Sequence, residues 1–132
     1  MTACVRVLLG RERYGVPVER VREVAELGDV VAVPGAGPHV AGIRHLHGEL
    51  LPVIRLDGLL RAPAAARRRI VVVEDGARRA GLAVDAAEEV EELPTPDRPG
   101  GALTLGAVLH DDHLIGLLNV PALLDAVTAT VA

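Results

Sequence analysis

The residues best suited to chemistry in this chain are its five histidines. His45 and His47 stand two apart on a predicted strand, so their side chains should share one face, with His39 nearby in sequence. A zinc site needs three or four ligands in a closed geometry, and no cysteine pair or glutamate stands at a matching spacing. We therefore favour polar side chains on an exposed or partner-facing strand over a metal site.

A second cluster, His110-Asp111-Asp112-His113, also has the residue types of a metal site. It falls between two apolar stretches, Leu103–Leu109 and Leu114–Val120, that predict a hairpin. Polar residues are the usual occupants of such a turn, so a turn is the favoured interpretation. A small histidine-based metal-binding protein or enzyme is the alternative of a different class.

The other reactive groups do not assemble into a catalytic set. Glu88–Glu92 supplies several carboxylates around Val90, but such a stretch is more typical of a solvated face. The glycines before Pro38 lack the lysine and hydroxyl residue of a phosphate-binding loop. Cys4 lies in an apolar run that predicts the first strand. Because no nucleophile, base and orienting group line up, the sequence predicts no enzyme, no catalytic residue, no metal and no cofactor.

The elements that must position these residues occur twice along the chain. Two nearly equal offsets align Gly10 with Gly76, Gly15 with Gly81, Glu23 with Glu89, Gly42 with Gly106 and Leu50 with Leu114. A fixed internal period predicts repeated structural modules. We expect a single domain over residues 1–132, made of two barrel halves at about 4–62 and 68–127 and joined within Arg61–Arg68.

Both halves show the same order of expected elements. In the first half these are a hairpin of Val5–Leu9 with Tyr14–Val16, a loop at Pro34–Pro38, a hairpin of Val40–Leu46 with Leu50–Leu56, and a short helix at Asp57–Leu60. In the second half they are Ile70–Glu74 with Arg79–Asp85, the loop Pro94–Gly101, the Leu103–Val120 hairpin and a helix opened by Pro121. Short strands separated by turn signals predict a mostly β fold of two small five-stranded barrels packed side by side.

Composition and charge exclude several classes of protein. The formal net charge of -4 argues against a nucleic-acid binder, and the near-absence of aromatic residues disfavours an RNA-binding barrel. A single cysteine excludes an internal disulfide and fits a reducing cytosol. We find no leader segment and no apolar run of about 18 residues, so we expect a cytoplasmic protein without direct membrane insertion.

The stretch Gly42–Leu56 resembles the central motif of the CheW-like chemotaxis coupling proteins, Gly-x-x-Asn-Leu-Arg-Gly-x-x-x-Pro-Val-x-Asp-Leu. Gly10–Val16, Val21–Val24 and Gly81–Asp85 also fit the family, and the similarity spans about residues 4–127. The resemblance implies two SH3-like five-stranded barrels with short helices and no enzymatic activity. It also implies an adaptor that touches the cytoplasmic tip of a chemoreceptor and the regulatory domain of a chemotaxis histidine kinase, and that could join rings with other CheW-like domains.

Three positions depart from the family motif: its Asn is His45, its Arg is His47 and its Asp is Arg55. In the family, that Arg pairs with the glutamate matching Glu23, on the face that meets the receptor. Here the partner of Glu23 has changed from a permanently charged group to an imidazole, a group that titrates near neutrality. Receptor coupling through Glu23 and His47 should therefore weaken as pH rises.

By resemblance, the receptor-binding residues are Val21, Glu23, Ile43, His45 and His47. A receptor helix needs a few aliphatic anchors with a polar rim, and this set supplies both kinds. We assign no kinase-binding residues.

The valines near the first hairpin leave two structures open. Val18, Val21 and Val24 have a spacing that fits one or two helical turns or the bent start of a strand. We expect Val18 and Val24 to fill the crease between the barrels.

Together these observations predict a non-enzymatic adaptor that couples chemoreceptors to a chemotaxis histidine kinase in a cytoplasmic signalling array. The alternative within the family is a divergent CheW-like protein of another chemosensory pathway, such as surface motility, that has lost one partner. The changes at His45, His47 and Arg55 motivate that alternative.

Overall fold

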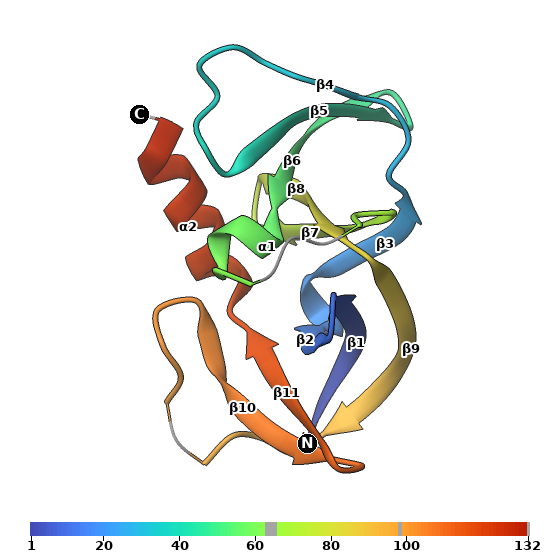
Figure 1. The fold of residues 1–132 in the computed structure, drawn as a ribbon, viewed down its shortest axis with the longest axis vertical. Coiled ribbons are helices and arrows are strands. Elements are labelled where there is room, and N and C mark those ends of the chain that lie inside the picture. The colour runs from blue at the N-terminus through green and yellow to red at the C-terminus, as the bar shows by residue number, and fades with distance from the viewer. Residues whose placement is uncertain (63–65, 98, 132) are drawn as a thin grey trace.

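The computed structural model describes residues 1–62, 66–97 and 99–131. Over these ranges the chain is mostly β with short helices, one of them at the C-terminal end (Figure 1), as the sequence predicted. No helix of the described residues is long and apolar enough to span a membrane. The expected joint at Arg61–Arg68 and loop at Pro94–Gly101 include residues 63–65 and 98, which lie outside the described residues.

The strands are β1 (Thr2–Leu9), β2 (Glu12–Pro17), β3 (Val21–Glu26), β4 (Val30–Val31), β5 (Val40–Leu46), β6 (Glu49–Arg55), β7 (Arg69–Asp75), β8 (Arg78–Val84), β9 (Ala86–Leu93), β10 (Thr104–His110) and β11 (His113–Leu118). The helices are η1 (Val18–Arg20), α1 (Leu56–Leu59) and α2 (Val120–Val131). The side chain of Asn119 caps α2, since its Oδ1 accepts a hydrogen bond from the backbone N–H of Ala122 at 3.2 Å.

In the described part of the chain, the strands form two sheets. Sheet A has five strands in the order β10-β11-β2-β1-β9, and sheet B has six in the order β3-β7-β8-β6-β5-β4. Sheet B has one strand more than the five expected in each barrel, because it includes the short strand β4. The predicted mostly β fold with short helices is confirmed.

Each sheet takes strands from both halves of the sequence (Figure 1). Sheet A joins β1 and β2 of the first half to β9, β10 and β11 of the second, and sheet B joins β7 and β8 to β3, β4, β5 and β6. This differs from the expectation that residues 4–62 and 68–127 each form their own barrel. The chain changes sheet directly after the first hairpin of each half, at η1 and again at Asp85.

The internal repeat is also visible in how the first hairpin of each half pairs with strands of the other half. Strands β11 and β2 pair in parallel with Leu117 opposite Gly15, and β6 and β8 pair in parallel with Val53 opposite Gly81. Gly15 and Gly81 are repeat equivalents. Both sheets are therefore assembled in the same way. In each, the first hairpin of one half pairs on both sides with strands of the other half.

The largest core cluster is shared by both sheets and α2. It comprises Val5, Val7, Leu9, Val16, Ile54, Leu56, Val71, Val73, Ala80, Leu82, Val84, Leu118, Val120, Leu123, Leu124 and Val127. Two smaller clusters belong to the separate sheets: Cys4, Leu93, Val108, Ile115 and Leu117 in sheet A, and Leu51, Val53, Ile70, Val72 and Ala83 in sheet B. Because burial of apolar surface is the main stabilising term, the shared cluster ties the two sheets into one body.

The segment that contains Val18, Val21 and Val24 includes both predicted structures. A short 3-10 turn, η1, is followed directly by strand β3. Val18 is 38% exposed and Val24 is 44% exposed, so the prediction that they fill the crease is wrong. Along β3 every second side chain turns toward solvent. This period of two places Val21, rather than Val24, against the shared core.

Candidate partner-binding surface

The expected contact between Glu23 and His47 is present. Glu23 lies on β3, His47 lies in the turn between β5 and β6, and Nε2 of His47 is 3.1 Å from Oε1 of Glu23. Because β3 forms one edge of sheet B and β5 lies near the other, the contact joins the two ends of the sheet. The side chains are 75% exposed for His47 and 35% exposed for Glu23, so a partner can reach both.

His45 and His47 do not share a face, which corrects the sequence interpretation. Strand β5 ends at Leu46, and His47 takes a left-handed backbone conformation with φ of 50°. The alternation of a strand therefore stops before His47. Its imidazole turns toward Glu23, while His45 lines a groove.

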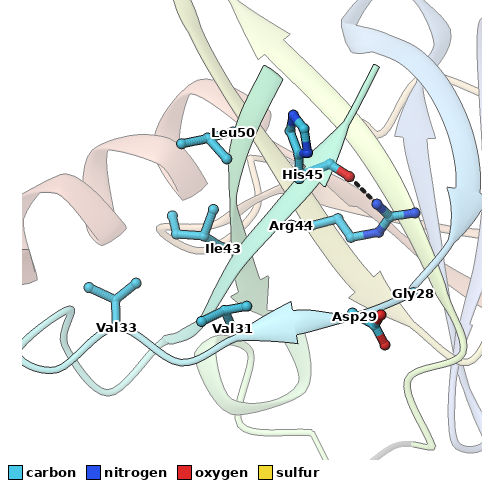
Figure 2. A pocket seen from close by; sticks show the side chains of 8 residues that line it. All are labelled: Gly28, Asp29, Val31, Val33, Ile43, Arg44, His45 and Leu50. Atoms are coloured by element: carbon cyan, nitrogen blue, oxygen red, sulfur yellow. Dashed lines mark hydrogen bonds between the residues drawn. The ribbon is translucent and has the colours of Figure 1, made fainter. Parts of the chain in front are cut away.

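This groove has a volume of about 650 Å³ and lies over β4, β5 and β6 (Figure 2). Its lining residues are Gly28, Asp29, Val31, Val33, Ile43, Arg44, His45 and Leu50. Figure 2 shows Val33, Ile43 and Leu50 toward one end and Asp29 and Arg44 toward the other. Val31 and Leu50 are 67% and 68% exposed, so the groove presents an apolar floor with a polar end.

The guanidinium of Arg44 is held in place at the polar end. Its Nε donates a hydrogen bond to the backbone carbonyl of Leu27 at 2.8 Å. Its Nη1 donates to the carbonyl of His45, the contact drawn in Figure 2. Arg44 thereby joins β5 to the chain that follows β3.

The structure divides the five predicted receptor-binding residues into three places. Glu23 and His47 contact each other, Ile43 and His45 line the groove, and Val21 is partly buried against the shared core.

The altered position Arg55 lies elsewhere on the surface. It is exposed, and its backbone N–H donates to the carbonyl of His39 at 2.8 Å. Within the described part of the chain, no hydrogen bond or ion pair joins its side chain to His45 or His47.

A second exposed apolar face lies on the β10–β11 hairpin. Leu109 and Leu114 are opposite each other in the antiparallel pair, so they share a face, and they are 68% and 69% exposed. Exposed apolar residues that lie side by side are a common feature of interaction surfaces. The sequence interpretation did not single out this face, although Leu114 is the repeat equivalent of Leu50 and so carried a signal.

Cys4 is buried in β1 and is unsuited to nucleophilic chemistry. Burial raises the pKa of its thiol to about 11, and the carboxylate of Glu92 adds to the increase. A reactive cysteine needs a thiolate at working pH. The structure thus agrees with the structural role expected of Cys4.

Among the residues that the structure describes, potential metal ligands do not gather around His39, His45 and His47. In residues 1–62, 66–97 and 99–131, the group of at least three His, Cys, Asp or Glu side chains close enough to hold an ion is Glu91, His110 and Asp111. The sequence indicated His110 and Asp111 as potential metal ligands but did not indicate Glu91. The fold brings Glu91, which is distant in sequence, close to them.

A family model described as the CheW-like domain matches residues 3–128. The chain belongs to this CheW-like family. Protein FrzA of Myxococcus xanthus is 31% identical to it over 119 residues, which are 88% of this chain and 72% of the relative. The probable chemotaxis protein CheW of Rhizobium etli is 28% identical over 127 residues, covering 87% of this chain and 82% of the relative.

The fold leads to the same family. The crystal structure of the scaffolding protein TtCheW from Thermoanaerobacter tengcongensis matches with a TM-score of 0.79 and 28% identity, over 89% of this chain and 88% of that one. These findings confirm the expected CheW fold and function class, a chemotaxis coupling or scaffold protein that is not an enzyme.

Proposed function

We propose that this CheW-like chain couples the cytoplasmic tip of a chemoreceptor to the regulatory domain of a chemotaxis histidine kinase. It acts as a single domain of residues 1–132, in the cytoplasm and within a signalling array. The observation that carries the proposal is the accessible Glu23–His47 contact, at the position of the family's Glu–Arg pair, on the same sheet as an apolar groove. The mechanism is binding alone.

The receptor face comprises the groove and the Glu23–His47 contact. Ile43 and Leu50 supply aliphatic anchors for a helix, and His45 supplies part of the polar rim. Val21 contributes the part of its side chain that the shared core leaves exposed. This arrangement suits the helical hairpin at a receptor tip, because a helix presents its own apolar stripe to such a groove.

The kinase face is the Leu109 and Leu114 surface on sheet A. It lies on a different sheet from the groove, so both partners can bind one molecule at the same time. Since the two sheets share one core, a displacement at either face can alter packing at the other.

The chain offers a matched pair of variants for testing this assignment. Leu50 and Leu114 are repeat equivalents of the same residue type, 68% and 69% exposed. We expect Leu50→Ser to weaken binding of the receptor tip by at least about tenfold and to spare the kinase domain, and Leu114→Ser to do the reverse. Titration calorimetry with each purified partner measures both. The division into two faces would be refuted if either variant lost binding to both partners. It would also be refuted if both variants kept binding to both partners.

The second candidate is a divergent CheW-like protein of another chemosensory pathway that has lost one partner. It is favoured by the replacement of the family's Arg by His47, and by a relative at 31% identity whose name, FrzA, differs from CheW. Binding of the kinase domain by the wild-type chain, without binding of any receptor tip from the same organism, would establish it.

A further inference from the structure

Three potential metal ligands meet where the edges of sheet A come together. Glu91 lies on β9 and His110 ends β10, the two strands at opposite edges of the sheet, and Asp111 begins the turn after β10. Nε2 of His110 lies 3.6 Å from Oε2 of Glu91 and 3.5 Å from Oδ2 of Asp111. Donors bound to one tetrahedral zinc ion at about 2.0–2.1 Å lie roughly 3.3 Å from each other. The three donor atoms all lie within 4.8 Å of one another, so side-chain movements of about 1–2 Å would bring them to coordination distance.

The internal repeat shows that the fold does not require polar groups at these positions. The repeat equivalents of Glu91 and His110 in sheet B are Ala25 and Leu46, and both pack against the apolar cluster of that sheet. An aliphatic pair therefore suffices at the same place in the other sheet. In sheet A it is replaced by a carboxylate and an imidazole, which are 28% and 29% exposed.

The charge around the three side chains suits a divalent cation. Nη1 of Arg6 lies 3.2 Å from both carboxylate oxygens of Glu91, and Arg6 is 13% exposed. Arg6 balances one of the two negative charges and fixes the Glu91 carboxylate, as outer hydrogen-bond donors do for metal-bound carboxylates. Glu88, 4.0 Å from another nitrogen of Arg6, adds a further negative charge nearby.

We propose that Glu91, His110 and Asp111 form a binding site for a divalent transition-metal ion of the zinc type. One nitrogen and two oxygen ligands match the preferences of Zn²⁺, and water would complete the coordination because Asp111 is 78% exposed. The ion would tie β9 to β10 and so close sheet A at its open side. The site lies on the other sheet from the receptor groove, so metal binding is separate from receptor coupling.

The test begins with the chain purified without a histidine tag, treated with a chelator and titrated with Zn²⁺ by calorimetry. We expect one ion per chain and a rise in melting temperature with Zn²⁺, because a ligand that binds the native state stabilises it. His110→Leu and Glu91→Ala copy the residues of the other sheet and should abolish both effects. No saturable binding up to about 1 mM Zn²⁺ would overturn the proposal.

Two further variants separate the site from unspecific binding and from misfolding. His47→Leu removes the other histidine–glutamate contact and should leave zinc binding unchanged. Asp111→Asn suits the left-handed turn conformation of φ 49° and should weaken binding by roughly tenfold or more while the fold persists. Zinc binding that is lost in His47→Leu, or that is unaffected by Asp111→Asn and His110→Leu, would contradict the assignment.

Discussion

The imidazole of His47 reaches back from the β5–β6 turn to the carboxylate of Glu23 on β3, with 3.1 Å between Nε2 and Oε1. A protonated imidazole forms an ion pair with this carboxylate, whereas a neutral one offers a hydrogen bond without the charge. The contact is exposed to a partner. The contact is therefore part of the surface that a docking receptor meets.

Removal of the imidazole should weaken receptor binding. The variant His47→Ala deletes the contact with Glu23. An exposed polar pair is worth up to about 1 kcal/mol, so we expect the dissociation constant for the receptor tip to rise roughly two- to fivefold. Titration calorimetry measures it.

The variant His47→Arg tests whether a permanent positive charge at this position strengthens coupling. A guanidinium stays charged and can form a bidentate pair with a carboxylate, so the variant should bind the receptor tip at least as tightly as the wild type. His39→Gln serves as the control, because His39 belongs neither to the groove nor to the Glu23–His47 contact. Weaker binding by His47→Arg, or unchanged binding by His47→Ala, would count against the role of His47.

Asp85 should make the fold sensitive to acid. Burial alone would raise the pKa of its carboxyl group, but backbone N–H donors from Arg67 at 2.9 Å and Gly10 at 2.7 Å, with Arg68 nearby, hold the pKa below its ordinary value. A lowered native pKa means that the stabilisation is present above about pH 4 and is lost as pH falls through the native pKa.

The variant Asp85→Asn isolates this contribution. It should lower the free energy of unfolding by roughly 1–3 kcal/mol at neutral pH and flatten the loss of stability in acid. Urea unfolding at a series of pH values provides the measurement. Equal stability of variant and wild type at neutral pH would show that the carboxylate stabilises the fold no more than the single acceptor oxygen that asparagine keeps.

The repeat-equivalent glycines Gly15 and Gly81 should respond differently to alanine. A Cβ at Gly15 would lie 3.0 Å from Cδ2 of Leu117 and 3.2 Å from Cβ of Cys4, while at Gly81 the nearest atoms, of Ile70, are 3.5 Å away. Overpacking costs about 1–3 kcal/mol, so Gly15→Ala should destabilise by that amount and Gly81→Ala by much less. Chemical denaturation of the two variants compares them, and equal losses would contradict the asymmetry.

The exchange of hairpins predicts that neither half folds alone. A fragment ending after α1 lacks β9, β10 and β11 of sheet A, and a fragment starting before β7 lacks β3, β4, β5 and β6 of sheet B. Each fragment should show little β structure by circular dichroism, and mixing them should restore it in an equimolar complex. Two independently folded fragments would mean that each half can close its own barrel.

Local patterns in the sequence determined much of this protein. Turn signals between apolar stretches predicted the hairpins, because turn chemistry and strand alternation depend on neighbours along the chain. The two nearly equal offsets, one of which aligns Gly15 with Gly81, predicted the repeat. The motif at Gly42–Leu56 identified the family, and with it the contact of Glu23 with His47 that the structure contains.

The tertiary structure alone decided how the predicted hairpins pair with one another to form the two sheets. The alternation along β1 and β2 is the same whether the neighbouring strand comes from their own half or from the other, so period could not reveal the exchange between the sheets. The sequence also predicted that Val18 and Val24 fill a crease between the barrels. The structure exposes both side chains, because burial depends on how the strands are assembled into sheets. Glu91 meets His110 only because two distant strands form opposite edges of one curved sheet, and no pattern of neighbours along the chain records such long-range pairing.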